Sequence, residues 1–338
     1  MLIKNISVAI SALISRIRSS GALWPFALTF SLLALIHLMV DTPMLLAERF
    51  IPGTGWIEIV LASLYASWVF MKMKDPRNVA LWRKNTWLLF TGVFFLQLLL
   101  GLLADDRFLM TGKLHLPVPA MIIAGPIYRL QLSFMPILFL TTVLITGPAW
   151  CSHLCYFGSL DNLAASGKAL RNHPIRNKMR WKHSLLLLFT GGALVFHLSG
   201  VSNQWAALAG AGVGATGLAL IFFVSRRKNK MIHCTVYCPV GTMAGYLKFV
   251  SPFRMRITES CTTCMACTLK CRYDALNLEN IRNRKPGLTC TYCGECLPAC
   301  HQQSIRYHFL WLSPSSARNL YLILTVTLHA CFLVLARI

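Results

Sequence analysis

The sequence predicts a membrane all-α fold with about seven transmembrane helices, an internal parallel two-helix repeat and a small α+β module. Hydrophobic residues make up 56% of the 338 residues and charged residues only 13%. Ordinary soluble domains carry about 25% charged residues. Two four-cysteine runs interrupt the apolar pattern near the C-terminus. With 13 cysteines, the chain is still too long and too apolar for a secreted disulfide scaffold.

Seven stretches are apolar enough to cross a bilayer, which takes roughly 17–25 residues per helix. They cover residues 22–40, 51–71, 86–104, 130–150, 184–204, 205–224 and 319–336. The fifth and sixth meet at residues 200–204, where the sequence predicts a tight turn. The first lacks a small-residue cleavage site and is predicted to be a retained anchor.

The distribution of basic residues predicts the orientation. If the N-terminus lies inside, the inner segments hold 28 Lys and Arg residues and the outer segments hold 5. Cytoplasmic loops are the ones that carry such an excess. The net charge of +22 is therefore read as a topology signal that requires no nucleic acid. We expect a multi-pass protein of the bacterial cytoplasmic (inner) membrane, with its N-terminus and its cysteine-rich module cytoplasmic.

The third and fifth spans resemble each other. A Trp-basic pair at 82–83, the run Leu-Phe-Thr-Gly at 89–92 and a glycine at 101 all recur 99 residues later. Each copy leads through a second span into a Cys-x3-Cys element, at 151–155 and at 234–238. Both copies run in the same direction, which predicts a repeat axis along the membrane normal. That axis would bring both cysteine pairs together at the cytoplasmic end.

Two runs with the spacing Cys-x2-Cys-x2-Cys-x3-Cys lie between the sixth and seventh spans, 29 residues apart. This spacing is typical of two-cluster ferredoxins, in which the fourth cysteine of each run serves the other cluster. One [4Fe–4S] cluster is assigned Cys261, Cys264, Cys267 and Cys300, and the second is assigned Cys290, Cys293, Cys296 and Cys271. Zinc is the alternative for such pairs. The proline that usually follows the fourth cysteine is replaced by Arg272 and His301.

These features divide the chain into four parts. We expect a two-helix membrane anchor at 1–80, a repeated membrane core at 81–256, a cytoplasmic two-cluster ferredoxin module at 257–311 and a last transmembrane helix at 312–338.

Together, the membrane helices, the two Cys-x3-Cys elements and the ferredoxin module resemble the NapH/MauN/NosR-type membrane polyferredoxin family. The resemblance covers roughly residues 80–310. It implies a quinol dehydrogenase-like electron-transfer subunit that serves a separate periplasmic redox protein. The chain keeps Cys238-Pro239, but the first element ends in Cys155-Tyr156, and the flavin-binding domain of NosR is absent from the sequence.

The four remaining paired cysteines are candidate metal ligands. In Cys151, Cys155, Cys234 and Cys238, a spacing of four places both thiols of a pair on one helical face. Four sulfurs could then bind a metal or a further cluster, or act as a thiol redox pair. Simple packing is the alternative, because buried cysteines behave as small hydrophobes.

Three histidines within the spans, His37, His197 and His329, are candidate catalytic residues near the outward helix ends. Ionisable residues in a membrane are costly. They could bind a quinone head group, relay its protons or, as a less favoured reading, ligate a b-type haem; interfacial packing is the alternative. His37 could also pair with Asp41. The segment 115–126 is too apolar for a free loop and is expected to be too rich in proline for a helix. It could roof a quinone pocket near Arg107, Lys113, His115 or Arg129.

The leading prediction is an oxidoreductase that couples the quinone pool to a periplasmic or cytoplasmic redox partner. Quinol gives up two electrons and two protons, whereas each cubane takes one electron, so the site needs both protonatable groups and one-electron carriers. One alternative is an accessory metal or thiol reductase that assembles another redox protein. The other is a redox-sensing membrane regulator.

Overall fold

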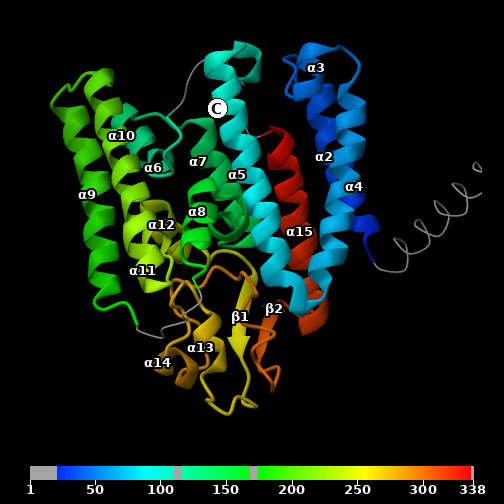
Figure 1. The fold of residues 1–338 in the computed structure, drawn as a ribbon, viewed down its shortest axis with the longest axis vertical. Coiled ribbons are helices and arrows are strands. Elements are labelled where there is room, and N and C mark those ends of the chain that lie inside the picture. The colour runs from blue at the N-terminus through cyan, green and yellow to red at the C-terminus, as the bar shows by residue number, and fades with distance from the viewer. Residues whose placement is uncertain (1–20, 110–115, 168–173, 336–338) are drawn as a thin grey trace, which may run out of the picture.

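The computed structural model describes residues 21–109, 116–167 and 174–335. Long helices stand side by side, and a small two-stranded module lies at one end of them (Figure 1). We call this end the module face. The long helices are α2 (Leu23–Met39), α4 (Gly55–Lys74), α5 (Val79–Leu103), α7 (Phe134–Thr146), α9 (Lys178–Leu198), α10 (Asn203–Ala219) and α15 (Pro314–Leu335). Each predicted span overlaps one of these helices. The predicted position of the N-terminus lies outside the described residues.

Within the residues that the structure describes, four helical segments are long and apolar enough to cross a membrane: Gly55–Lys74, Pro76–Leu103, Asn203–Lys228 and Pro314–Leu335. Helices α2 and α7 are also apolar but shorter, with 17 and 13 residues. Large apolar side chains project outward from the long helices, among them Leu99 and Leu208, which are 52% and 61% exposed. Soluble monomers rarely present large apolar patches to water. The chain is therefore a mostly helical membrane protein.

The connections between the long helices contain short elements. These are α3 (Leu46–Phe50), η1 (Pro76–Asn78), η2 (Asp106–Phe108), η4 (Leu220–Ser225) and α11 (Arg226–Lys228). Between α9 and α10 the chain turns within a few residues, and Gly200 takes a left-handed conformation there (φ 63°). Glycine adopts this conformation without steric cost. The tight turn predicted between the fifth and sixth spans is confirmed.

The proline-rich segment before α7 corrects one expectation, because it contains helix α6 (Met121–Arg129) with Pro126 inside it. The segment was expected to be too rich in proline for a helix. The earlier prolines precede the helix, where a missing N–H costs nothing, so only Pro126 removes a helical hydrogen bond. Helix α6 packs on α9, and its Tyr128 hydroxyl donates to the carbonyl of Val201 at 2.6 Å. Lys113 and His115 lie outside the described residues.

The two Cys-x3-Cys elements fold alike. The first cysteine lies in a π-helical turn, η3 (Trp150–Leu154) or η5 (His233–Tyr237). The backbone is extended at the second cysteine, and a short helix follows, α8 (Tyr156–Ala164) or α12 (Pro239–Leu247). Gly158 and Gly241 allow each short helix to pack close to the backbone of the preceding π-helical turn. A Cβ on them would lie 3.2 Å from the Cys151 carbonyl oxygen and 2.6 Å from that of Cys234.

The module is built on two antiparallel strands, β1 (Phe253–Ile257) and β2 (Ile305–Phe309), with Phe253 opposite Phe309. Helices α13 (Ala266–Lys270) and α14 (Leu278–Arg282) lie between them in the chain. The domain boundary predicted after residue 256 therefore falls inside β1. Tyr321 of α15 is fully buried against the module, with ring centroids 5.4 Å from Phe253 and 5.0 Å from Tyr307. The last long helix and the module thus share one core.

Candidate metal centres

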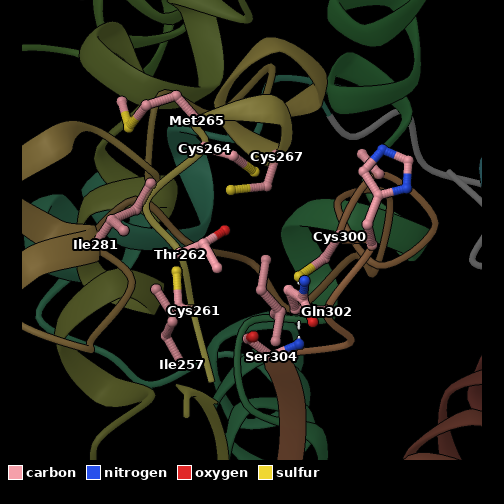
Figure 2. Close-up of a pocket in the computed structure, with 13 residues that line it drawn as sticks. Ile257, Cys261, Thr262, Cys264, Met265, Cys267, Ile281, Cys300, Gln302 and Ser304 are labelled. Carbon is pink, nitrogen blue, oxygen red and sulfur yellow. Dashed lines mark hydrogen bonds between the residues drawn. The ribbon is translucent and has the colours of Figure 1, made fainter. Parts of the chain in front are cut away.

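Four thiols from both cysteine runs line one cavity of the module (Figure 2). They are Cys261, Cys264, Cys267 and Cys300, the set assigned from sequence to one cluster. The cavity has a volume of about 380 Å³, part of it open to solvent. We call it the first module site. The crossed ligand assignment remains a proposal, and this arrangement supports it.

The backbone around the cysteines repeats every 29 residues, as the sequence does. Left-handed conformations flank the second cysteine of each run, at Thr263 and Met265 (φ 59° and 62°) and at Tyr292 and Gly294 (φ 56° and 79°). Such turns direct successive backbone N–H groups into a concave surface that suits anions.

The fourth cysteine of each run receives a matching hydrogen bond. The backbone N–H of Ala275 donates to the Cys271 sulfur at 3.3 Å, and that of Ser304 donates to the Cys300 sulfur at 3.2 Å. Both bonds stabilise a charged sulfur.

The other four thiols of the module form a second group deeper in the protein. Burial raises the pKa of the Cys296 thiol well above its usual range, and the neighbouring Cys293, Cys271 and Cys290 raise it further. Cys267 of the first module site is also near enough to contribute. We call Cys271, Cys290, Cys293 and Cys296 the second module site. Metal binding would take the place of the protons that burial holds on these thiols.

The Cys-x3-Cys elements bring their four thiols together at the module face. Burial raises the pKa of the Cys234 thiol, and Asp161 and the thiols of Cys155, Cys238 and Cys151 raise it further, in that order. Cys151, Cys155 and Cys238 share one apolar cluster. We call these four cysteines the four-thiol site. Their convergence agrees with what the predicted repeat axis requires.

The four-thiol site adjoins the second module site. A cavity of about 270 Å³ is lined by Cys151, Cys234 and Cys290. Two hydrogen bonds cross the same boundary: the Tyr273 hydroxyl donates to the Cys151 carbonyl at 2.9 Å, and the Ser152 hydroxyl donates to the Thr291 carbonyl at 3.1 Å. The thiols therefore form a series from the helices to the surface of the module, where Cys264 is exposed.

Arg83 of α5 fixes the module to the helices. Its guanidinium is fully buried and donates to Glu295 between two module cysteines, at 3.1 and 2.5 Å. It also donates to the Ser152 carbonyl at 2.8 Å and to the Asn162 side chain at 3.0 Å. Arg272, which stands where ferredoxins usually have proline, donates to the same Asn162 oxygen at 2.9 Å.

A second group of ion pairs also holds the module against the membrane helices. Asp274, which follows the first cysteine run, pairs with Lys178 of α9 at 2.8 Å and with Lys230 at 3.5 Å. Lys230 also donates to the Cys271 carbonyl at 3.0 Å. Both ends of the second membrane hairpin are thereby held against the module.

The sequence places the three candidate histidines near the outward helix ends, and the structure gives each of them different surroundings. His37 contacts Trp56 near the start of α4, with ring centroids 5.1 Å apart, whereas His329 bonds Tyr65 about 13.5 Å further along that helix. His197 bonds the Tyr128 carbonyl at 2.9 Å. Glu48 lies beside His37 at Gly55, so the carboxylate near His37 is Glu48. None of the three lines either cavity described above.

The thiol sets suit clusters better than single ions. Within the described ranges, no three His, Cys, Asp or Glu side chains converge closely enough to hold one metal ion. A zinc ion needs that convergence, because its sulfur ligands all lie about 2.3 Å from one centre. Four thiolates on a cubane bind four different irons and can stand further apart. Sets of four soft sulfurs with N–H donors are the ligands that iron–sulfur clusters use.

Two segments, residues 130–178 and 210–257, match the family model for a 4Fe-4S binding domain. Each carries one Cys-x3-Cys element, and neither reaches the eight cysteines of the module. No curated protein and no solved structure matches the chain. Together with the thiol geometry, the family match identifies an iron–sulfur protein of the membrane, a class suited to electron transfer. The match indicates 4Fe–4S binding at the two segments that carry the Cys-x3-Cys elements.

Proposed function

We propose that this protein carries electrons between a quinone in the bilayer and a redox partner, as a quinol dehydrogenase-type oxidoreductase subunit of a respiratory chain. The observation that carries the proposal is the cavity shared by Cys151, Cys234 and Cys290. This cavity places thiols of the Cys-x3-Cys elements next to a thiol of the module. The proposal also places the chain in the NapH/MauN/NosR-type family, which the combination of motifs favours.

Three [4Fe–4S] clusters form the proposed path. The four-thiol site would hold one, next to the second module site, and the first module site would complete the series at the exposed Cys264. When bound, the clusters supply one-electron transfer. The protein keeps water away from the inner two sites, because most of their thiols are buried or half-buried. The same series serves electrons that move in either direction.

The proposed topology has seven spans, with the module face in the cytoplasm of a bacterium and the membrane core built from a parallel repeat. The basic residues support it, because those in connections at the module face greatly outnumber those at the opposite end. The shared fold of the two Cys-x3-Cys elements supports the repeat. A periplasmic or cytoplasmic protein would exchange electrons with the chain.

His329 is the histidine that best suits a role at the quinone. Its ring is 4% exposed, with one nitrogen 3.2 Å from the His153 carbonyl oxygen and the other 3.0 Å from the Tyr65 hydroxyl. A carbonyl oxygen only accepts, so Nδ1 donates and Nε2 accepts the tyrosine proton. This pair can pass a proton. We expect His329→Gln to slow cluster reduction by a quinol analogue at least tenfold in stopped-flow absorbance, with His197→Gln as control and dithionite reduction unchanged.

The path itself is tested by removing the four-thiol site. We expect Cys151→Ser/Cys234→Ser to lose about a third of the bound iron and to lose reduction of the module by quinol, while dithionite still reduces it. Anaerobic iron analysis and stopped-flow absorbance measure the two effects. Cys331→Ser is the matched control, because this buried cysteine packs against α2 and α4 residues, away from the other thiols. If quinol never reduces the wild-type clusters and no quinone copurifies, the proposed function fails.

A further inference from the structure

Lys182 is a buried cation without a carboxylate partner. The residue is 1% exposed, and no Asp or Glu lies within ion-pair distance of it in the part of the chain that the structure describes. Among the described residues its ammonium donates one hydrogen bond, a long one of 3.4 Å, to the Thr235 carbonyl. A buried charge is very costly unless another charge or several hydrogen bonds compensate it.

The cavity beside Lys182 contains other donors that lack acceptors. Thr289 and Thr291 line it with Lys182, and both hydroxyls are buried with no hydrogen-bond partner among residues 21–109, 116–167 and 174–335. Cys151 and Cys234 line the same cavity. Three donors therefore face a space bounded by thiols. Buried polar groups are normally paired, so this surrounding fits an anion that accepts from all three.

Arg83 provides an internal comparison. It occupies the position in the first predicted repeat copy that Lys182 occupies in the second, each after a tryptophan. Arg83 is compensated by Glu295. Lys182 instead lines one cavity with the thiols of Cys151 and Cys234. Anionic sulfur in this cavity would supply the compensating charge that Lys182 lacks.

We infer that Lys182 is the counter-cation of an anionic iron–sulfur cluster in the four-thiol site and sets its reduction potential, with Thr289 and Thr291 donating to the same sulfurs. The inference rests on the proposed cluster at that site. A positive charge stabilises the more negative, reduced state, so it raises the potential. Lys182 would thus make the four-thiol site a better electron acceptor than its buried, apolar surroundings alone would allow.

The test is a redox titration of the purified protein, followed by electron paramagnetic resonance. The relevant signal is the one lost in Cys151→Ser/Cys234→Ser. We expect Lys182→Gln to lower its midpoint potential by at least the 59 mV that corresponds to a tenfold change in a one-electron equilibrium. Lys182→Arg keeps the charge and should keep the potential. Arg180→Met, which removes an exposed charge two residues away on α9, should also keep it.

The outcomes separate this inference from the proposed function. If no signal depends on Cys151 and Cys234, the cluster itself is absent and the proposed path fails. If the signal is present and the Gln and Arg variants have equal potentials, the role of Lys182 is wrong. Loss of the signal in both variants would also overturn the inference. It would show that Lys182 supports the packing of the site and that its charge is not what matters.

Discussion

Cys300→Ser should abolish the same paramagnetic signal that Cys261→Ser abolishes and leave the signal that depends on Cys290. The reason is spatial, because Cys300 lies in the cavity of the first run although it belongs to the second run in sequence. Each variant should lose about four irons per chain, since a cubane with three ligands is readily lost. Anaerobic iron analysis and low-temperature spectra measure both quantities.

The reciprocal variant makes the test decisive. Cys271→Ser should remove the Cys290-dependent signal and spare the other, because the thiols of Cys271, Cys290 and Cys293 lie near enough to Cys296 to raise the pKa of its thiol. Cys331→Ser again serves as control and should retain every signal. If Cys300→Ser and Cys290→Ser lose the same signal instead, each run holds its own cluster and the crossed assignment is wrong.

Arg83→Met should lower the free energy of unfolding by about 3–5 kcal/mol, the usual cost of breaking a buried ion pair from one side. The substitution leaves Glu295, at 7% exposure, with only its longer ion pair to Arg272 at 3.9 Å, and it removes the donors to Ser152 and Asn162. We expect the module to separate from the helices before they unfold. Denaturant titration in detergent, with limited proteolysis to detect release of the module, measures the change.

Two variants bracket this prediction. Arg83→Met/Glu295→Gln removes the stranded charge and should recover much of the lost stability. Arg107→Met breaks an exposed pair with Asp105, at 2.6 Å, and should leave unfolding unchanged. A neutral result for Arg83→Met alone would show that Tyr321 and the strand core hold the module without the ion pair.

Apolar length and cysteine spacing predicted the position of each long helix and the module between α11 and α15. They did so because helix formation in a membrane and cluster binding both depend on local sequence. The boundary at β1 was missed although Phe-Arg-Met-Arg-Ile alternates apolar and basic residues, because its arginines were read only as inner-side charge and its partner strand lies about 50 residues away. Helix α6 was missed because proline was weighed by number and not by position in the helix.

The surroundings of the three histidines and the residues that hold the module to the helices could be seen only in the structure. The sequence placed Arg83, Lys182 and Lys230 on the basic side, but it gave only a topological reason for them. In the folded protein, Arg83 and Lys230 pair with acids of the module, and Lys182 faces thiols. A pairing between residues more than 200 positions apart, such as Arg83 and Glu295, leaves no local pattern. The shared Trp-basic pair of the two predicted copies was the one available signal.

The exposed thiol of Cys264 determines how preparations of this protein will age in air. Oxidation of cysteine follows access to solvent, and the other module thiols are buried or half-buried. Damage should therefore begin at this corner and proceed inward, so that the outermost electron carrier disappears first while the membrane end stays intact. Aerobic samples would then keep the membrane end of the proposed path and lose electron exchange at the module surface, whichever way the electrons move.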